Sequence, residues 1–205
     1  MRKARQRRLP HTAHTSLPWR IHELTSDFRL EDVWALPTPG ERDDFPRLVQ
    51  RFASTDPAQG PSRAARTLWT IRWKLGELLD WDGPRSGLGA RVSTLRDRFP
   101  EDLRDAPQGP ILDTVPFTSL YLLEDEWAAE IANETVHGVL HVGWVPDNGT
   151  GGYRGQMAVL VKPNGLRGNV YMAAIRPFRH TVIYPPMMRQ IERDWSAGAG
   201  DSPPT

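Results

Sequence analysis

The sequence predicts an α+β protein built on an antiparallel sheet, and three observations carry this prediction. Residues 135–145 and 153–162 are rich in β-branched and aromatic residues and are joined by a turn-rich stretch, which is typical of a long hairpin. Apolar residues recur at helical spacing before this hairpin, and again after it near the C-terminus. With 205 residues, the chain is long enough to bury one substantial core.

The charge distribution separates a basic N-terminus from a mildly acidic body. Five basic residues lie in the first eight positions, and the remaining residues hold 21 Lys and Arg against 25 Asp and Glu, a net charge of −4. Such a body gives no general footprint for nucleic acid. We predict a mobile basic arm over residues 1–17, one domain over 18–195 and a disordered tail over 196–205. Two interpretations of the arm stay open: binding to an anionic polymer or surface, and simple solvation.

Composition also limits the chemistry and the location. The chain has no cysteine, which excludes disulfides and thiolate catalysis. It shows neither a secretory signal pattern nor an apolar run of about 18 to 20 residues, so we expect a cytoplasmic protein without a membrane span. Arginine greatly outnumbers lysine, which suggests a bacterial coding bias. The stretch 149–155, GTGGYRG, lacks the strand and helix of a phosphate loop, and we expect no metal and no cofactor.

The first half of the chain predicts one strand and several helices. Residues 19–24 alternate in the manner of a short edge strand. Residues 26–36 predict a short helix that carries Phe28, Val33 and Trp34. A second helix begins at Asp43 or Asp44, with Phe45, Leu48, Val49 and Phe52 on one face. The clearest helix covers residues 63–79, followed by a long loop over 82–110 with one helical turn near 91–99.

The second half predicts the remaining strands and the last helices. Residues 115–122 and 126–132 indicate strands, although alanine and glutamate leave a helical turn open for the second. Residues 168–184 are apolar almost all round, which favours a helix kinked at Pro177, with a further strand pair as the alternative. A helix then restarts at Pro185, with Met188, Ile191 and Trp195 on one face.

Three stretches carry a resemblance to a known family: EIANETVHGVLHVGWV, GGYRGQMAVLVKPNG and YMAAIRPFRH. Over about residues 17–195 the chain resembles a bacterial domain-of-unknown-function family of the START and pollen-allergen-like helix-grip (SRPBCC) superfamily. The resemblance implies an antiparallel curved sheet wrapped around a long C-terminal helix, with two or three helices inserted after the first strand. Members of this superfamily typically hold an apolar ligand between helix and sheet, and some are cyclases or hydrolases. We count about five strands where the superfamily has six or seven, and no catalytic residue is transferred.

Two histidines on the central strand are the sharpest chemical candidates. His137 and His141 are four residues apart, so on a strand they share one face with Cα atoms about 13 Å apart, too far to bind one metal directly. They either line a cavity as acid–base groups or lie on the outer face in water. The apolar residues Val136, Leu140, Val142 and Trp144 favour the outer face.

Two function classes follow from these residues. We expect the chain to bind a small apolar or amphipathic molecule between the sheet and the C-terminal helix, with a homodimer as a further possibility. The alternative is an enzyme of cyclase, dehydratase or hydrolase type in the same cavity, with His137 or His141 as acid–base group and Tyr153 or Arg176 at an oxyanion. Residues 124–126 form an acidic triplet that is typical of an exposed turn, with a general base or weak cation site as the alternative. The candidate ligand-contacting residues are Trp69, Trp73, His137, His141, Trp144, Tyr153, Gln156, Arg176 and His180.

Overall fold

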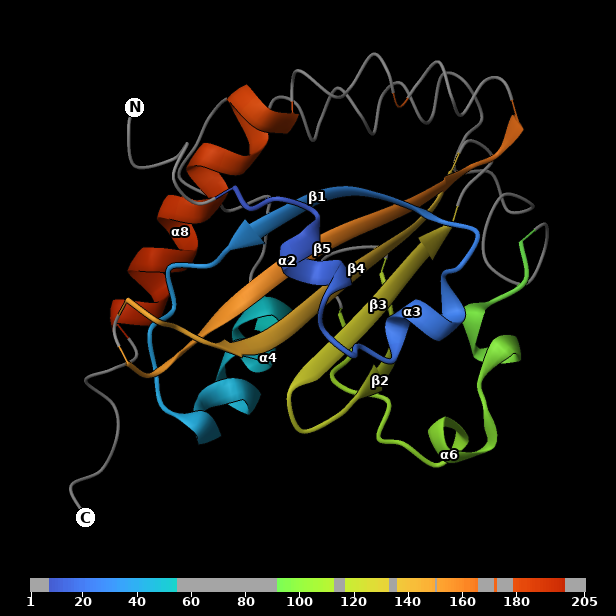
Figure 1. The fold of residues 1–205 in the computed structure, drawn as a ribbon, viewed down its shortest axis with the longest axis horizontal. Coiled ribbons are helices and arrows are strands. Elements are labelled where there is room, and N and C mark those ends of the chain that lie inside the picture. Colours follow the sequence, from blue (N-terminus) through green and yellow to red (C-terminus); the bar gives the residue numbers. More distant parts are fainter. Residues whose placement is uncertain are drawn as a thin grey trace.

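The computed structural model describes residues 8–54, 92–112, 117–132, 136–149, 151–165, 172 and 179–197. Within them a five-stranded sheet runs in the order β1-β5-β4-β3-β2, and every neighbouring pair is antiparallel (Figure 1). The strands are β1 (Arg29–Ala35), β2 (Thr118–Leu122), β3 (Glu126–Ala132), β4 (Val136–Pro146) and β5 (Tyr153–Pro163). The α+β class and the antiparallel sheet are confirmed.

Strands β2 to β5 lie where the sequence predicts them. β3 pairs with β4 from Glu126 opposite Gly143 to Ala132 opposite His137, so the helical alternative for residues 126–132 is wrong. Trp127 and Ala129 contribute to one core and Ala128 to another. Because both faces of the sheet are covered, small residues are accommodated in this strand despite their helical preference.

The first strand is not where the sequence places it. Residues 19–24 form a helical turn, α3 (Ile21–Leu24), whereas residues assigned to a helix form β1. The register of β1 against β5 shifts between Leu30 and Asp32. This bulge breaks the two-residue alternation, so that Leu30, Val33 and Trp34 have the spacing of a helix although they lie on a strand.

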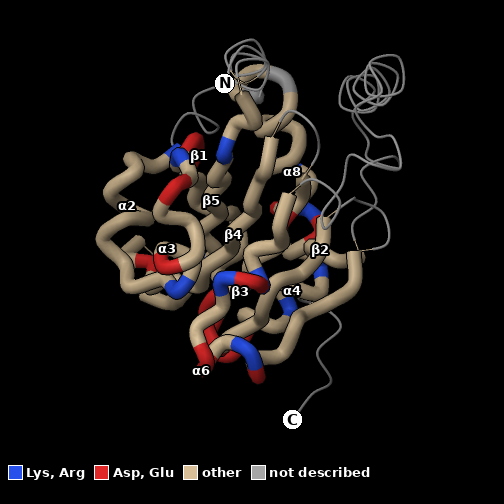
Figure 2. Tube along the Cα trace, turned by 90° about the vertical axis from the view of Figure 1, so that its right-hand side faces the viewer, with Lys and Arg blue, Asp and Glu red and all other residues tan. Residues whose placement is uncertain are grey.

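Each face of the sheet is covered by its own set of helices. Helices α2 (Thr12–Thr15) and α3 lie on one face, and α4 (Phe45–Ser54) and α8 (Tyr184–Ala197) on the other (Figure 2). We call these the histidine face and the α8 face. The core of the histidine face also takes residues from η3 (Leu95–Arg98) and α6 (Glu101–Arg104).

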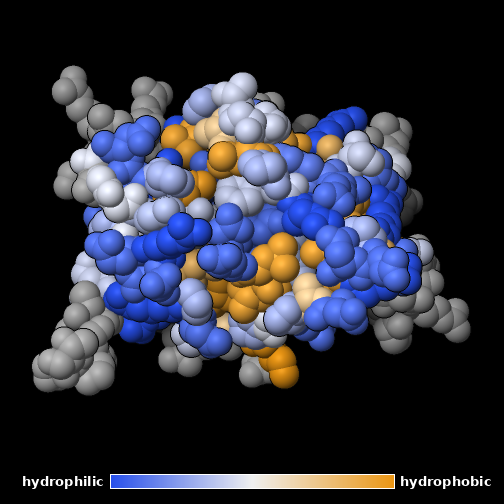
Figure 3. Space-filling model, turned by 60° about the horizontal axis from the view of Figure 1, so that its bottom comes forward, coloured by the Kyte–Doolittle hydropathy of each residue, from blue (hydrophilic) through white to orange (hydrophobic). Residues whose placement is uncertain are grey.

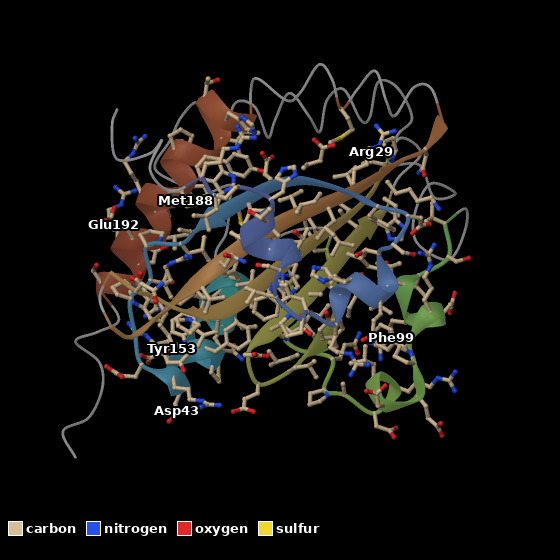
Figure 4. The ribbon with its side chains drawn as sticks, viewed as in Figure 1. Arg29, Asp43, Phe99, Tyr153, Met188 and Glu192 are labelled. Carbon is tan, nitrogen blue, oxygen red and sulfur yellow. The ribbon has the colours of Figure 1, made fainter. Side chains whose placement is uncertain are left out.

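The two cores are separated by the sheet. Phe99 lies beside α3 and α6 in the core of the histidine face, whereas Met188 lies on α8 in the other core (Figure 4). Residues of β4 alternate between them, with Val139 and Val145 in the first and Val142 and Trp144 in the second. The sheet is therefore the middle layer of three. Successive side chains along a strand point alternately into one core and into the other.

The chain from Arg8 onward is part of the fold, although the sequence assigns residues 8–17 to a mobile arm. Arg8 forms a bridge to Trp34, and the Leu9 N–H donates to the Val33 carbonyl at 2.9 Å. His14 in α2 is buried. These contacts cover the outer edge of β1, and the Leu122 N–H likewise donates to Pro107 at the edge of β2.

The predicted helices have mixed outcomes. Helix α4 is confirmed and follows a short turn, η1 (Arg42–Asp44), in which Glu41 and Asp44 form a reciprocal capping box. Helix α8 is confirmed, with Met188 and Trp195 buried, and Ser196 and Ala197 of the predicted tail belong to it. It follows a π-helical turn, η4 (Arg179–Ile183). The predicted helix at 63–79, the reversal at 133–134, most of 168–178 and the tail 198–205 lie outside the described residues.

The surface combines polar and apolar regions. Figure 3 shows apolar side chains gathered in the middle of one face and surrounded by hydrophilic ones. Ile111 is an exposed large hydrophobic residue, with 82% of its surface accessible. Among the described helices none has both the length and the apolar character that a membrane crossing needs. The homodimer stays a prediction.

Candidate functional site

Two buried glutamate–histidine pairs lie side by side on the histidine face. His141 Nε2 lies 2.8 Å from Glu126 Oε2, and His137 Nε2 lies 2.8 Å from Glu130 Oε2. In both pairs the histidine on β4 stands opposite the residue two positions beyond its glutamate on β3. The four side chains are at most 3% exposed. Repeated four-residue spacing on both strands therefore places two equivalent diagonal pairs in the interior.

The pair at Glu126 continues into a chain of three imidazoles. His141 Nδ1 lies 3.2 Å from His14 Nε2, and His14 Nδ1 lies 3.1 Å from His22 Nε2. The other carboxylate oxygen of Glu126 accepts the Arg20 N–H at 2.8 Å. His14 comes from α2 and His22 from α3, so this chain of contacts ties both short helices to the sheet.

Burial dominates the electrostatics of this chain. It raises the pKa of Glu126 to about 7 and lowers the pKa of His141 to about 3. The pKa of His14 is also lowered to about 3, first by burial and then by its histidine neighbours. Half-buried His22 has a lowered pKa for the same first reason. At neutral pH the imidazoles are therefore uncharged, and Glu126 is the group that titrates.

The second pair is bound to the segment that precedes α6. Glu130 accepts hydrogen bonds from the Thr94 hydroxyl and from the Leu95 N–H, the latter at 3.1 Å. The ring of Phe28 meets His137 edge-on at 5.0 Å between centroids. Glu130 thus has partners on both oxygens, which is the arrangement that makes a buried carboxylate tolerable.

A separate polar group lies on the α8 face, where β1 meets the C-terminal helix. The Tyr184 hydroxyl donates to Asp32 Oδ2 at 3.0 Å, and His180 Nε2 lies 2.6 Å from Asp32 Oδ1. Trp34 packs against Tyr184 with 4.7 Å between ring centroids. Its indole N–H is buried and has no hydrogen-bond partner among the residues that the structure describes. The rings of Trp34 and Tyr184, the carboxylate of Asp32 and the unpaired Trp34 N–H therefore lie close together.

The structure distributes the predicted site residues over both faces. His137, His141 and Gln156 lie on the histidine face, where Gln156 Nε2 donates to the Ala13 carbonyl at 3.0 Å. On the α8 face Trp144 stacks on Tyr153 at 6.5 Å with an angle of 10° between the rings, and His180 lies at Asp32. Trp69, Trp73 and Arg176 lie outside the described residues.

Two interpretations from the sequence are wrong. The histidines do not lie in water, since His137 is 2% exposed and His141 is fully buried beneath the N-terminal residues. Glu126, assigned to an exposed acidic turn, is also buried. The histidines are misplaced because β4 is covered on both faces, so apolar residues on one face do not show that the other face is exposed. Glu126 is misplaced because it is the first residue of β3 and not part of the turn before it.

Several partners went unrecognised in the sequence. Glu126 and Glu130 share the four-residue spacing of His137 and His141 on the preceding strand, and this pairing is visible in the sequence once a hairpin is assumed. His14 and His22 lie in the segment treated as a mobile arm and an edge strand, and no local pattern indicates them. Among the described residues, no three histidine, aspartate or glutamate side chains are arranged to hold a metal ion.

Comparison with known proteins gives one match. The model of a family described as "Protein of unknown function (DUF2867)" matches residues 24–187, which is most of the chain. Comparison with curated proteins and with solved structures finds no match.

Proposed function

We propose that this chain, which belongs to that family of proteins of unknown function, binds an apolar or amphipathic small molecule between its sheet and its C-terminal helix. The observation that carries the proposal is the buried indole N–H of Trp34, which has no acceptor within the described residues. An unpaired buried donor costs about 1–3 kcal/mol, and a ligand oxygen bound there would offset this cost.

The surroundings of Trp34 suit such a ligand. Tyr184 and His180 supply further ring surface, with centroids 4.7 and 6.3 Å from Trp34. The buried carboxylate of Asp32 fixes both of these side chains from behind. Ligand sites are typically mostly apolar, with a few fixed polar groups that orient the ligand. The group at Trp34 has this composition.

Thermal shift and native mass spectrometry with fatty acids, steroids and aromatic polyketides test the proposal. We expect at least one class to raise the melting temperature and to give a stoichiometric adduct. Trp34→Phe keeps an aromatic ring but removes the N–H and part of the indole, so this variant should lose some stability through the smaller ring and bind about tenfold more weakly. The proposal would be excluded if, with every compound class, the native mass spectrum showed only the ligand-free protein and the melting temperature did not change.

The matched control is Trp144→Phe on the same face. The Trp144 indole N–H already donates to the Glu41 carbonyl at 3.0 Å. Its removal should cost about 1 kcal/mol of stability beyond the loss in the Trp34 variant, without the affinity loss of that variant. Equal binding by the wild type and Trp34→Phe would show that the ligand lies elsewhere.

A second candidate function, acid–base catalysis of the cyclase, dehydratase or hydrolase type, is favoured by one specific observation. His137 and His141 both lie inside the protein beside a carboxylate. They lie on the face opposite α8, so their chemistry would not share the site proposed at Trp34. Hydrolysis of p-nitrophenyl esters tests the hydrolase case: His141→Gln should abolish turnover, and a rate equal to the wild type would exclude His141.

A further inference from the structure

The chain from Glu126 to His22 connects the interior to the surface without a break. Each histidine uses its Nε2 atom for the contact on the Glu126 side: His141 with Glu126 Oε2 at 2.8 Å, His14 with His141 Nδ1 at 3.2 Å, and His22 with His14 Nδ1 at 3.1 Å. His14 and His141 use both ring nitrogens in the chain. His22 is the half-buried end, and its remaining nitrogen is Nδ1.

This order couples the tautomers of the three rings. A neutral imidazole has one donor nitrogen and one acceptor nitrogen. If Glu126 is ionised, His141 must donate from Nε2, which makes its Nδ1 an acceptor for His14, and the same reasoning extends to His22. If Glu126 is protonated, its hydroxyl donates to His141 and every bond in the chain reverses. The protonation of Glu126 thus selects between two complete hydrogen-bond patterns.

We propose that Glu126, His141, His14 and His22 form a proton path, which makes the His22 imidazole the group through which this face exchanges protons with solvent. The site lies on the face opposite Trp34 and is independent of the ligand site proposed there. If the histidine face carries out acid–base chemistry, protons would enter and leave through His22 and not through the buried His137 or His141.

The transfer balances along the chain. A proton from water binds His22 Nδ1, and the Nε2 proton of His22 passes to His14 Nδ1. His14 then passes its Nε2 proton to His141 Nδ1, and His141 passes its own to Glu126 Oε2. One proton enters, one carboxylate is neutralised, and all three imidazoles end uncharged with their protons on Nδ1.

Other polar groups surround the carboxyl of Glu126. The Arg20 guanidinium pairs with Asp102 at 2.5 Å and with Glu23 at 2.9 Å, so only its backbone N–H bonds to Glu126, although its positive charge also acts to lower the pKa of Glu126. The Tyr121 hydroxyl is buried without a hydrogen-bond partner among the described residues, and its pKa is raised by burial and then by the charge of Glu126.

Two weaker neighbours complete the surroundings. The pKa of Asp125 is raised by burial and by the charge of Glu126, and His11 acts weakly on His14. Within the described residues, the buried carboxyl of Glu126 therefore has one imidazole partner, and that imidazole leads to the surface.

Long-range ¹H–¹⁵N spectra of the full chain, labelled at histidine and recorded from pH 6 to 8.5, test the path. Such spectra report which ring nitrogen carries the proton. We expect His14, His22 and His141 to move from Nδ1–H at low pH to Nε2–H at high pH, with one shared midpoint. In a second sample labelled with ¹³C at glutamate, the Glu126 carboxyl signal should titrate at the same midpoint.

Glu126→Gln should abolish the tautomer change, because an amide does not titrate in this range. Glu124→Gln alters an exposed neighbour and should leave the change intact. If the Glu126 variant does not fold, the wild-type spectra decide alone. Fixed tautomers, different midpoints for the three rings, or conversion of the buried rings to imidazolium would overturn the path.

Discussion

Gly143 and Gly155 show how single residues shape this sheet. A Cβ atom on Gly143 would lie 2.6 Å from the ring of Trp19, and one on Gly155 would lie 2.7 Å from Leu48. Each of these glycines leaves room for a large side chain from the layer that covers its face of the sheet.

Gly143→Ala should destabilise the protein by about 1–3 kcal/mol, because the added methyl group meets a rigid indole ring in a packed core. Urea denaturation with an unchanged m-value would measure this. Gly149→Ala is the control, since its nearest contact is 3.4 Å away in an exposed turn. Equal stability of both variants would show that Trp19 moves aside freely.

The buried histidines show the limit of prediction at this scale. Their shared face on β4 follows from sequence spacing alone. Their burial depends on residues 8–24, which carry no strong periodic signal. Polar partners that lie far apart in the sequence, such as His14 and His141, are revealed only by tertiary structure.

At the scale of elements, helix α8 is fixed to the rest of the protein near its C-terminal end. The Trp195 indole N–H donates to the Pro39 carbonyl at 2.8 Å, and the Arg47 guanidinium lies 4.1 Å from the centre of the Trp195 ring. Arg47 also donates to the Trp195 carbonyl at 2.8 Å. One arginine on α4 thus holds both the ring and the backbone of the last turn.

Arg47→Lys should cost about 1 kcal/mol, because an ammonium group keeps the charge but loses the planar contact with the ring. Chemical denaturation measures the loss. Arg189→Lys, on the exposed side of α8, should remain within about 0.5 kcal/mol of the wild type. A loss as large in the control would point to α8 helicity and not to this contact.

The elements also show what a sequence conveys well. Strands β2 to β5 and helix α8 follow from regular apolar periods and clear turn signals. The sequence predicts a helix in place of β1, because the bulge of this strand imitates helical spacing. It predicts a strand in place of α3, because one turn of helix is too short to establish a period. Irregular and very short elements depend on contacts with the remainder of the fold.

At the scale of the whole molecule, the middle sheet creates two separate interiors with different chemistry. The histidine face holds His14 and His141 with lowered pKa values and Glu126 with a raised pKa, whereas the α8 face is dominated by aromatic packing. Folding therefore removes two histidines from their ordinary titration range, and it also retains a proton on Glu126 at higher pH than the unfolded chain does.

These shifts act in opposite directions on stability. The unfolded chain protonates His14 and His141 as the pH falls below 6.5, whereas the folded state resists this until about pH 3, so acid favours unfolding. Glu126 has a raised folded pKa, so its contribution is full below its ordinary value of 4.5 and is lost as the pH rises through about 7. Two histidines outweigh one glutamate. From pH 7 to pH 5 the free energy of unfolding should fall on the order of 1–2 kcal/mol.

Urea denaturation at pH 7, 6 and 5 measures this change. Glu126→Gln removes the opposing contribution, so its stability should fall more steeply than that of the wild type over the same range. Stability that stays level or rises toward pH 5 would contradict burial of neutral histidines.

The contacts of Leu9 with Val33 and of Pro107 with Leu122 have a consequence for self-assembly. A sheet whose outermost backbone groups are free can recruit an unrelated polypeptide as an additional strand and grow into fibrils. Here segments of the same chain occupy part of each rim, so the molecule carries its own protection against runaway growth of the sheet.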